Sequence, residues 1–475
     1  MSLAWQAVPH LVVRGGGGIY YGPSAQMVAN PSLNSDGFST VTNWNPTQFN
    51  ADGNTIFNSS SDCVNNGDVN GCYSLGNPFP EGVVQLTGSS LGPETNLGGT
   101  LNTVLHSQRT MTTYNFNFGL EYEFPHQTIL SAAYVGSRGL FLPLGGVDLN
   151  QLSLQTIQQY GAGLCVTGDP SCMVANPWEA ILPSTNAYYG SATVPQWMAL
   201  QPFPQFGNGN YGAGNGVMVH AYPGGDSEYS SLQTKLEKRM TSHFTTLATF
   251  TWGKIVTDDG APPLGFVGYH GNGAPQDWQN LKLEHSISAQ DVKYQFNWQA
   301  SYDLPIGKGR WINLHGAADE ALGGWTINTI AYLSTGVPIA APNGTENLYF
   351  AQRVDQICDP AKGAPHTPTM WFNYSCFAQP ASPFVAGTAP AFLSHVRTDG
   401  AHDLDVSLYK NLSLGGERTL RLEVSSYNVT NSVQFGYPNV FWNPSPTADN
   451  MAGFGQITSD ANLPRQFQFG ARFNF

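Results

Sequence analysis

The sequence has few charged residues and no long apolar run. Asp, Glu, Lys and Arg make up 11% of its 475 residues, against about 25% in ordinary soluble domains. No apolar run approaches the roughly 18 residues of a membrane-spanning helix, and the mean hydropathy is −0.22. The net charge of −13 argues against nucleic acid as a partner, because phosphate binding requires a basic surface. These absences argue against a helical membrane protein and a nucleic-acid-binding protein.

The chain also lacks the motifs of common enzymes. It contains no H-E-x-x-H zinc motif, no G-x-S-x-G nucleophile motif and no phosphate-binding loop. No two of its six cysteines have the C-x-x-C spacing of zinc ligands. We therefore expect no catalytic residue, no metal and no cofactor, and a function other than catalysis.

Aromatic and turn-forming residues are abundant instead. The sequence contains 26 Phe, 21 Tyr, 11 Trp, 53 Gly and 32 Pro. Many aromatics and turn formers with few charges suit a membrane β-barrel with long loops. The same composition also suits a secreted all-β protein.

The last stretch of the chain alternates strictly between apolar and polar residues. Phe467, Phe469, Ala471, Phe473 and Phe475 fall on one side of a period-2 strand, and Gln, Gly, Arg and Asn fall on the other. Lipid on one side and water on the other would produce this pattern. The alternative is an amphipathic strand of a soluble β-sandwich.

Ten further segments show strand-like patterns, which makes eleven expected strands. They cover residues 2–8, 11–22, 110–124, 128–140, 229–240, 244–257, 291–305, 325–340, 403–414, 418–432 and 466–475. Short and long connections alternate between them, as short periplasmic turns and long extracellular loops do in outer-membrane barrels. The expected long loops cover about 23–108, 141–228, 258–290, 341–402 and 433–462.

The expected fold is therefore all-β, a transmembrane antiparallel β-barrel sheet of about eleven strands. The first and last strands would run in the same direction, so an ordinary antiparallel closure is impossible. We expect an incomplete wall in which strands 2–8 and 466–475 do not pair with each other.

The six cysteines form three local pairs, each inside one expected loop. Disulfides in an oxidising compartment are the natural interpretation, although six cysteines allow 15 pairings. The candidates are Cys63 with Cys72, Cys165 with Cys172, and Cys358 with Cys376.

A few charges lie within the expected strands. Their register places Glu121, Glu123, Arg421 and Glu423 on the polar, lumen-facing side, where they belong either to a hydrated wall or to a ligand path. Tryptophans in the expected loops could stack on a sugar or peptide ligand, or pack the loops together; these are Trp44, Trp178, Trp197, Trp278 and Trp371.

The end of the chain resembles the C-terminal signal that the barrel-assembly machinery reads in outer-membrane β-barrels. Gly470, Phe473 and Phe475 match its Gly-x-x-Phe-x-Phe pattern. The signal usually has a polar residue before the glycine, whereas Phe469 stands here, so the match is partial.

Several sequence segments occur in the same order as in one protein family. They are RGGGGIYYGP, AAYVGSRG, YSSLQTKLEKR, TWGK, LPIGKGR, LGGWTINTIAYLSTGVPI, WFNYSCFAQPA, DLDVSLYKNLSL and YNVTNSVQFGYP. Together they resemble the barrel of Oar-like TonB-dependent outer-membrane transporters. The resemblance implies a barrel of about 22 strands with a plugged lumen, of which residues 1–475 are the C-terminal portion. The signal peptide and the plug, through which TonB would act, are not found, so we expect this chain to be the downstream part of a longer precursor.

The expected function is that of a receptor or transporter in the outer membrane of a Gram-negative bacterium, which takes up or exports a ligand. Its expected partners are outer-membrane lipid, the barrel-assembly machinery and an extracellular ligand that the sequence does not name. The alternative is a surface adhesin or carbohydrate-binding all-β protein that acts through its long loops.

Overall fold

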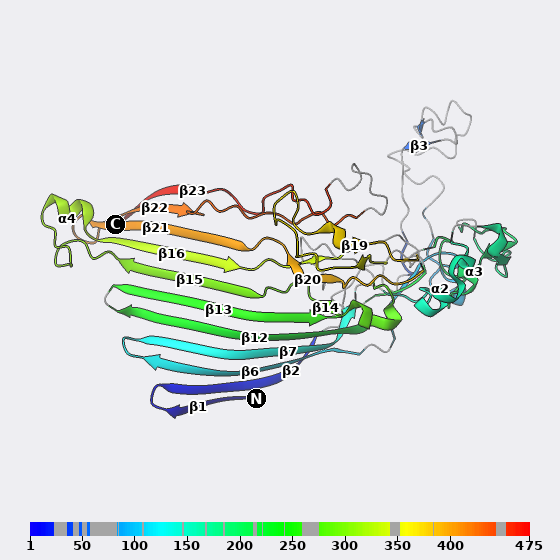
Figure 1. The fold of residues 1–475 in the computed structure, drawn as a ribbon, viewed down its shortest axis with the longest axis horizontal. Helices are drawn as coiled ribbons and strands as arrows, with labels where there is room; N and C mark the ends of the chain where they lie inside the picture. The colour runs from blue at the N-terminus through cyan, green and yellow to red at the C-terminus, as the bar shows by residue number, and fades with distance from the viewer. Residues whose placement is uncertain are drawn as a thin grey trace.

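One large antiparallel sheet dominates the structure (Figure 1). The computed structural model describes residues 1–22, 36–40, 47–49, 55–57, 83, 85–106, 109–144, 147–166, 169–183, 186–211, 216–220, 222–241, 243–258, 275–342, 352–382, 384–442 and 453–475. The main strands follow each other in sequence order: β1 (Ser2–Val8), β2 (Leu11–Gly22), β6 (Met111–Phe124), β7 (Thr128–Leu144), β12 (Tyr222–Thr241), β13 (Phe244–Thr257), β15 (Tyr294–Asp303), β16 (Trp325–Ser334), β21 (Ala401–Ser413), β22 (Thr419–Tyr427) and β23 (Gln466–Asn474). All eleven predicted strands are confirmed.

The predicted strand over 325–340 is too long. β16 ends at Ser334, and β17 (Pro338–Ala340) pairs with β20 (Phe392–Arg397) instead of extending the sheet. The chain leaves the sheet at Gly336, whose carbonyl accepts a hydrogen bond from Arg397 Nη1 at 3.0 Å.

Other strand ends also differ from the prediction. β22 stops at Tyr427 because Asn428 has a left-handed backbone, with φ of 48°. The Asn428 side chain then donates to the carbonyl of Ser432, which fixes the loop. β7 and β12 extend past the expected loop bounds, since Tyr222 pairs with Leu144.

The register gives the sheet one apolar face and one polar face. Phe118 on β6 lies opposite Tyr134 on β7, whereas the preceding Asn117 lies opposite Val135. At the C-terminal edge, Phe469 pairs with Val424 on the apolar face. Phe118 and Phe469 are 56% and 78% exposed, so the apolar face is uncovered at these strands in the described chain.

Aromatic side chains mark both ends of the apolar face, as in membrane barrels. We define the turn-end girdle as Phe124, Phe244, Tyr302, Trp325 and Phe473. The loop-end girdle consists of Tyr21, Tyr114, Trp252 and Tyr294.

The connections separate by length at the two ends of the strands (Figure 1). At one end, here called the turn end, lie connections 9–10, 125–127, 242–243, 304–324 and 414–418. Three of these turns use a histidine with positive φ, at His10, His126 and His243, a conformation for which histidine is enriched. All the longer connections lie at the opposite end, here called the loop end.

The two outer strands of the sheet do not pair with each other. β1 pairs with β2, and β23 pairs with β22, and the described residues contain no hydrogen-bonded ladder between β1 and β23. The predicted incomplete wall is therefore confirmed. In lipid, such edges leave unsatisfied backbone groups that each cost several kcal/mol, so a membrane-embedded sheet requires further strands along them.

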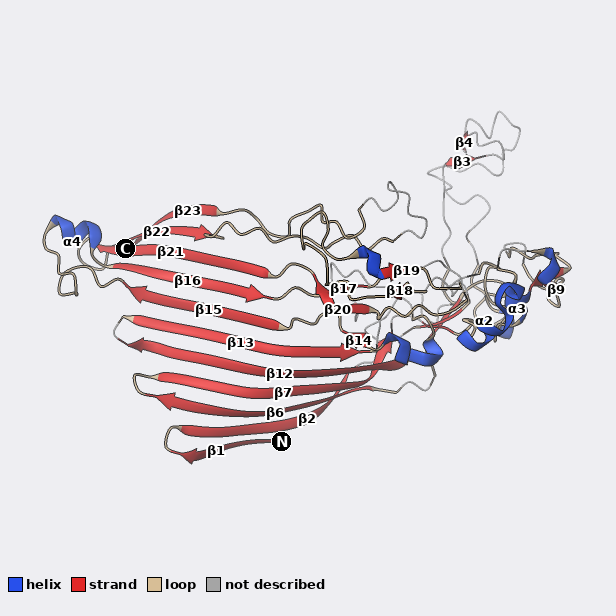
Figure 2. Cartoon of the chain, viewed as in Figure 1, coloured by secondary structure: helices blue, strands red, loops and turns tan. Residues whose placement is uncertain are grey.

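Helices lie beyond the ends of the sheet (Figure 2). At the turn end is α4 (Ala317–Leu322). No helix of the described segments has the length and hydropathy to cross a membrane. The loop end contains helical elements α2 (Leu154–Tyr160), α3 (Gln196–Ala199), η2 (Gly92–Glu94), η3 (Gly161–Leu164), η4 (Pro170–Cys172), η5 (Trp278–Glu284) and η6 (Tyr374–Cys376), and strands β3 (Thr47–Phe49), β4 (Thr55–Phe57), β5 (Leu101–Thr103), β8 (Val147–Asp148), β9 (Met173–Ala175), β10 (Thr193–Pro195), β11 (Val217–Val219), β14 (Ser286–Ile287), β18 (Asp355–Gln356) and β19 (Phe377–Ala378).

Candidate ligand-binding site at the loop end

Two of the predicted polar-face charges lie near the N-terminal edge of the sheet. Glu121 on β6 accepts a hydrogen bond from Arg14 Nη2 on β2 at 3.3 Å. Glu123 lies 3.7 Å from His10 Nδ1 in the neighbouring turn. These carboxylates therefore have basic neighbours close to the turn end.

The other two charges lie near the opposite edge. Arg421 Nε donates to Glu423 Oε2 at 3.1 Å on β22, and the Arg421 guanidinium stacks 3.9 Å from the Tyr409 ring centre. The structure thus does not bring the four predicted charges together. Their assignment to a hydrated wall, with a ligand path as the alternative, remains a prediction.

A hollow of about 740 Å³ opens at the loop end of the polar face. It lies where β16, β21, β22 and β23 meet the long connections. Its polar lining includes three carboxylates, two phenols, four primary amides and one imidazole: Asp399, Asp403, Asp405, Tyr332, Tyr427, Asn428, Gln434, Asn462, Gln466 and His402.

The carboxylates of the hollow are held without a cationic partner. The backbone N–H groups of Asn428 and Phe435 donate to Asp405 and Asp399, each at 2.9 Å. Within the described residues, no ion pair joins these two groups or Asp403 to a Lys, Arg or His. The hollow is therefore a region of negative potential.

No sequence pattern singles out this acidic group. Asp403 and Asp405 occupy alternate positions of β21, and the register of the sheet puts both on the polar face. Asp399 precedes that strand, and only the fold places it beside them.

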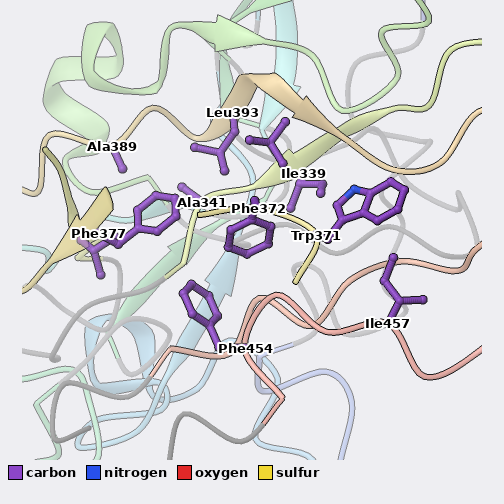
Figure 3. Packing of buried hydrophobic residues seen from close by; sticks show 11 residues of the cluster. Ile339, Ala341, Trp371, Phe372, Phe377, Ala389, Leu393, Phe454 and Ile457 are labelled. Atoms are coloured by element: carbon purple, nitrogen blue, oxygen red, sulfur yellow. The ribbon is translucent and has the colours of Figure 1, made fainter. Parts of the chain in front are cut away.

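A packed apolar core lies among the long loops beside the hollow (Figure 3). We call the described residues of the loop-end connections from residue 147 onward the cap. In its first core, the Phe372 ring lies edge-on to Phe377 and Phe454, with ring centres 6.0 and 5.2 Å away. Phe372 is fully buried, and Phe454 comes from a loop much later in the chain. This core therefore joins two separate long loops.

A second apolar core forms within the connection between β7 and β12. Its buried members include Leu164, Val194, Trp197 and Met198. Phe384, from the loop that follows β16, packs against them. Burial of these side chains gives this loop a core of its own, since each contributes about 1.5–3 kcal/mol of transfer free energy.

A buried ion pair lies between these loops. Arg353 Nη1 donates to Glu284 Oε2 at 2.6 Å, and both residues are 1% exposed. Two further Arg353 donors reach backbone oxygens, Nε to Ala389 at 2.9 Å and Nη2 to Leu283 at 2.7 Å. These hydrogen bonds offset part of the cost of burying the charged pair.

Gln276 extends this network to a third loop. Its Oε1 accepts from the backbone N–H groups of Arg353 and Gly387, at 2.9 and 3.1 Å. Its own backbone N–H donates to Glu284, and its carbonyl accepts from Gln151 Nε2 at 3.0 Å. Three long loops therefore meet at one polar network.

A second ion pair lies within the cap and is joined to the sheet through Asp291. Arg397 Nη2 donates to Asp291 Oδ2 at 2.5 Å. The other oxygen of Asp291 accepts from the backbone N–H of Ile255 on β13 at 2.7 Å. The cap is thus fixed above the strands rather than connected only by its own chain.

Local environment shifts the pKa of several cap residues. Burial raises the pKa of Tyr437 to about 12, and its Oη accepts from the backbone N–H of Ala340. Burial also raises the pKa of Asp258. The pKa of Asp359 is lowered because the Ala361 N–H donates to its carboxylate, with a further hydrogen bond to His395.

The cap tryptophans pack the loops together. Trp197 and Trp371 are 3% and 8% exposed, and Trp371 Nε1 donates to the carbonyl of Arg397. Trp44 lies outside the described residues. In the part of the chain that the structure describes, no three His, Cys, Asp or Glu side chains form a metal-binding group.

The sheet, its two faces and the cap can now be compared with known proteins. The sequence profile of the outer membrane beta barrel domain family matches residues 1–468. The chain belongs to this family. Membership confirms the predicted outer-membrane location and assigns lipid to the exposed apolar face. A comparison with curated protein sequences found no match.

Solved structures similar to this outer-membrane barrel domain include three receptors or transporters. The ferric-catecholate import receptor Fiu from E. coli K12 is 9% identical, with coverage of 99% of this chain and 34% of that chain, and a TM-score of 0.37. The outer membrane transporter YddB from Escherichia coli is 10% identical, with coverage of 97% and 38% and a TM-score of 0.40. The ferripyoverdine receptor of Pseudomonas aeruginosa is 10% identical, with coverage of 100% and 32% and a TM-score of 0.38. The chain spans about a third of the length of these proteins. None of these comparisons identifies the Oar-like group, which remains a prediction.

The cap of this outer-membrane barrel domain contains two of the three expected disulfides. Cys165–Cys172 and Cys358–Cys376 are bonded, with Cα atoms 5.4 and 4.7 Å apart. Cys63 and Cys72 lie outside the described residues. Cys376 is buried beside Phe377 of the first apolar core, so its bond constrains the loop at the core.

Replacing both Cys358 and Cys376 by serine should lower the free energy of unfolding by about 3 kcal/mol, because the unfolded chain regains the entropy of the closed loop. Urea unfolding of the protein in detergent micelles, followed by tryptophan fluorescence, measures this change. The matched Cys165→Ser/Cys172→Ser variant closes a shorter loop and should lose about 2 kcal/mol. A Cys358→Ser/Cys376→Ser variant as stable as the wild type would contradict the prediction.

The residues of the expected assembly signal lie on the last strand and just beyond it. Phe473 belongs to the turn-end girdle, and the Phe475 ring stacks near it, with ring centres 6.0 Å apart. Gly470 pairs with Glu423 on the polar face. Their recognition by the barrel-assembly machinery remains a prediction.

Proposed function

We propose that this chain forms the ligand-facing wall of an outer-membrane receptor that takes up or exports a ligand. In this proposal the cap faces the cell exterior and the turn end faces the periplasm. The observation that carries it is the hollow at the loop end of the polar face, beside loops that pack into a fixed cap. A hollow between rigid loops and a polar wall is a suitable place for a ligand to enter.

The chemistry of the hollow favours a ligand with basic or hydrogen-bond-donating groups. Asp399, Asp403 and Asp405 present carboxylate oxygens, and Tyr332 and Tyr427 add aromatic surface. Aromatic rings beside carboxylates suit cations, which interact with both. No catalytic step is part of this function.

The energy source for transport is inferred from the resemblance to Oar-like transporters, and not from residues of this chain. We propose that it acts through a plug domain and TonB, and that further strands complete the wall along β1 and β23. The region encoded upstream of Met1 tests this assignment. A plug domain and a TonB box there would support a receptor, whereas their absence would favour the surface adhesin.

The hollow itself can be tested with a polyamine probe. Spermine should bind the wild-type protein in micelles about tenfold more tightly than an Asp403→Asn/Asp405→Asn variant, because each lost ion pair contributes up to about 1 kcal/mol. Isothermal titration measures both affinities. Glu417→Gln, in the exposed turn 414–418, removes a similar charge far from the hollow and should bind spermine as the wild type does. Equal affinities for all three proteins would rule out the hollow as a cation site.

A further inference from the structure

The connection between β15 and β16 differs from the other turn-end connections. It covers residues 304–324 and contains α4, whereas the others cover only 9–10, 125–127, 242–243 and 414–418. We call residues 304–324 the turn-end lobe. The proposed receptor function does not use this connection.

The turn-end lobe lies beyond the ends of the strands (Figure 1) and is hydrogen-bonded to two residues at the border of the apolar face. Trp325 on β16 and Lys410 on β21 are paired on that face. Trp325 Nε1 donates to the carbonyl of Ala321 at 3.0 Å, and Lys410 Nζ donates to the carbonyls of Glu320 and Asp319. Lys410 is only 6% exposed. Both residues thus hold the C-terminal half of α4 beside the lipid-facing surface, and Lys410 also offsets the helix dipole.

One side of α4 is apolar and uncovered. Successive helical residues are about 100° apart, so Ala317, Ala318, Ala321 and Leu322 fall within an arc of about 140°. Asp319 and Glu320 lie on the other side, where the Asp319 carboxylate accepts from the backbone N–H of Lys308 at 2.7 Å. No residue of α4 is buried.

The rest of the lobe adds exposed apolar and basic side chains. Trp311 is 88% exposed, Leu322 59% and Ile312 45%. Lys308 is exposed three residues before Trp311. Tryptophan beside a basic residue is typical of the membrane–water interface, where the indole reaches the headgroup level and the cation meets lipid phosphate.

We propose that the turn-end lobe is an interfacial anchor, seated in the phospholipid headgroups and upper acyl chains of the leaflet at the turn end. Its continuity with the lipid-facing surface identifies phospholipid as the occupant. Trp325 belongs to the turn-end girdle and also hydrogen-bonds to α4, so the C-terminal end of α4 adjoins that girdle. The lobe thereby fixes the depth of β15 and β16 in the membrane.

Fluorescence quenching by brominated lipid tests this inference. The protein is folded in bicelles of phosphatidylethanolamine and phosphatidylglycerol that contain a brominated phosphatidylcholine. The emission of a Trp311→Phe variant is subtracted from that of the wild type to isolate Trp311. We expect this component to lose more intensity with bromines close to the headgroup than with bromines near the chain ends, and little intensity to aqueous acrylamide.

A Trp371→Phe variant, whose emission is subtracted in the same way, is the matched control. Trp371 is buried in the cap, so its emission should be quenched neither by brominated lipid nor by acrylamide. A Trp311 component quenched by acrylamide but not by brominated lipid would place the lobe in water and overturn the proposal. A component that neither quencher reaches would show that the lobe is covered by protein, another chain or a second copy, and would overturn it equally.

Discussion

An Arg353→Met variant should lose about 3–5 kcal/mol of cap stability, because the Glu284 carboxylate would remain buried without its cation. The side chains of Arg353 and Glu284 are 1% and 2% exposed, with 2.6 Å between their charged atoms. The backbone oxygens of Ala389 and Leu283 would lose their donors as well. Urea unfolding in detergent micelles, followed by near-ultraviolet circular dichroism, measures the loss.

The same variant should make the cap sensitive to protease while the strands stay protected by the micelle. Three long loops meet at this network, through Gln151, Gln276 and Arg353, so its loss should open all three. An Arg353→Met/Glu284→Leu double variant should recover much of the stability, since the apolar pair leaves no buried charge. Arg239→Met, at a side chain that is 67% exposed, is the control and should change stability by less than about 1 kcal/mol. An Arg353→Met cap as resistant as the wild type would refute this account of the network.

Arginine at position 118 should be far more costly than arginine at position 117. Phe118 lies on the apolar face near the middle of β6, and Asn117 lies on the polar face one residue earlier. Phe118→Arg should lower the free energy of unfolding in phospholipid bicelles by about 2–4 kcal/mol, the cost of a cation near the bilayer midplane. Asn117→Arg should stay within about 0.5 kcal/mol, as for a solvated surface site.

This pair of variants compares the environments of the two faces, because both introduce an arginine at neighbouring positions of the same strand. Urea titrations of both variants give the comparison. Similar losses for both, or a larger loss for Asn117→Arg, would mean that the face identified as lipid-facing has been assigned wrongly.

Much of the sheet could be predicted because successive side chains of a strand face lipid and water in turn, so their polarity alternates along the sequence. Alternation of apolar and polar side chains located β6 and β15 and assigned their faces, since each side chain meets lipid or water directly. The prediction failed where a strand changed partners. Residues 335–340 still alternate in part, yet β17 leaves β16 and pairs with β20, which no local pattern reveals.

The sequence by itself determined the number and order of the strands, their two faces and the separation of short turns from long loops, and it indicated two cysteine pairs that the structure shows bonded. Only the tertiary structure decided how the long loops pack. Arg353 and Glu284 are 69 residues apart, and Trp278 and Gln151 are 127 apart. Loop residues have no periodic relation to a fixed surface, so their partners depend on how the sheet positions the loop ends. The same reason explains why Asp399 joins Asp403 and Asp405 at the hollow only once β20 and β21 are in place.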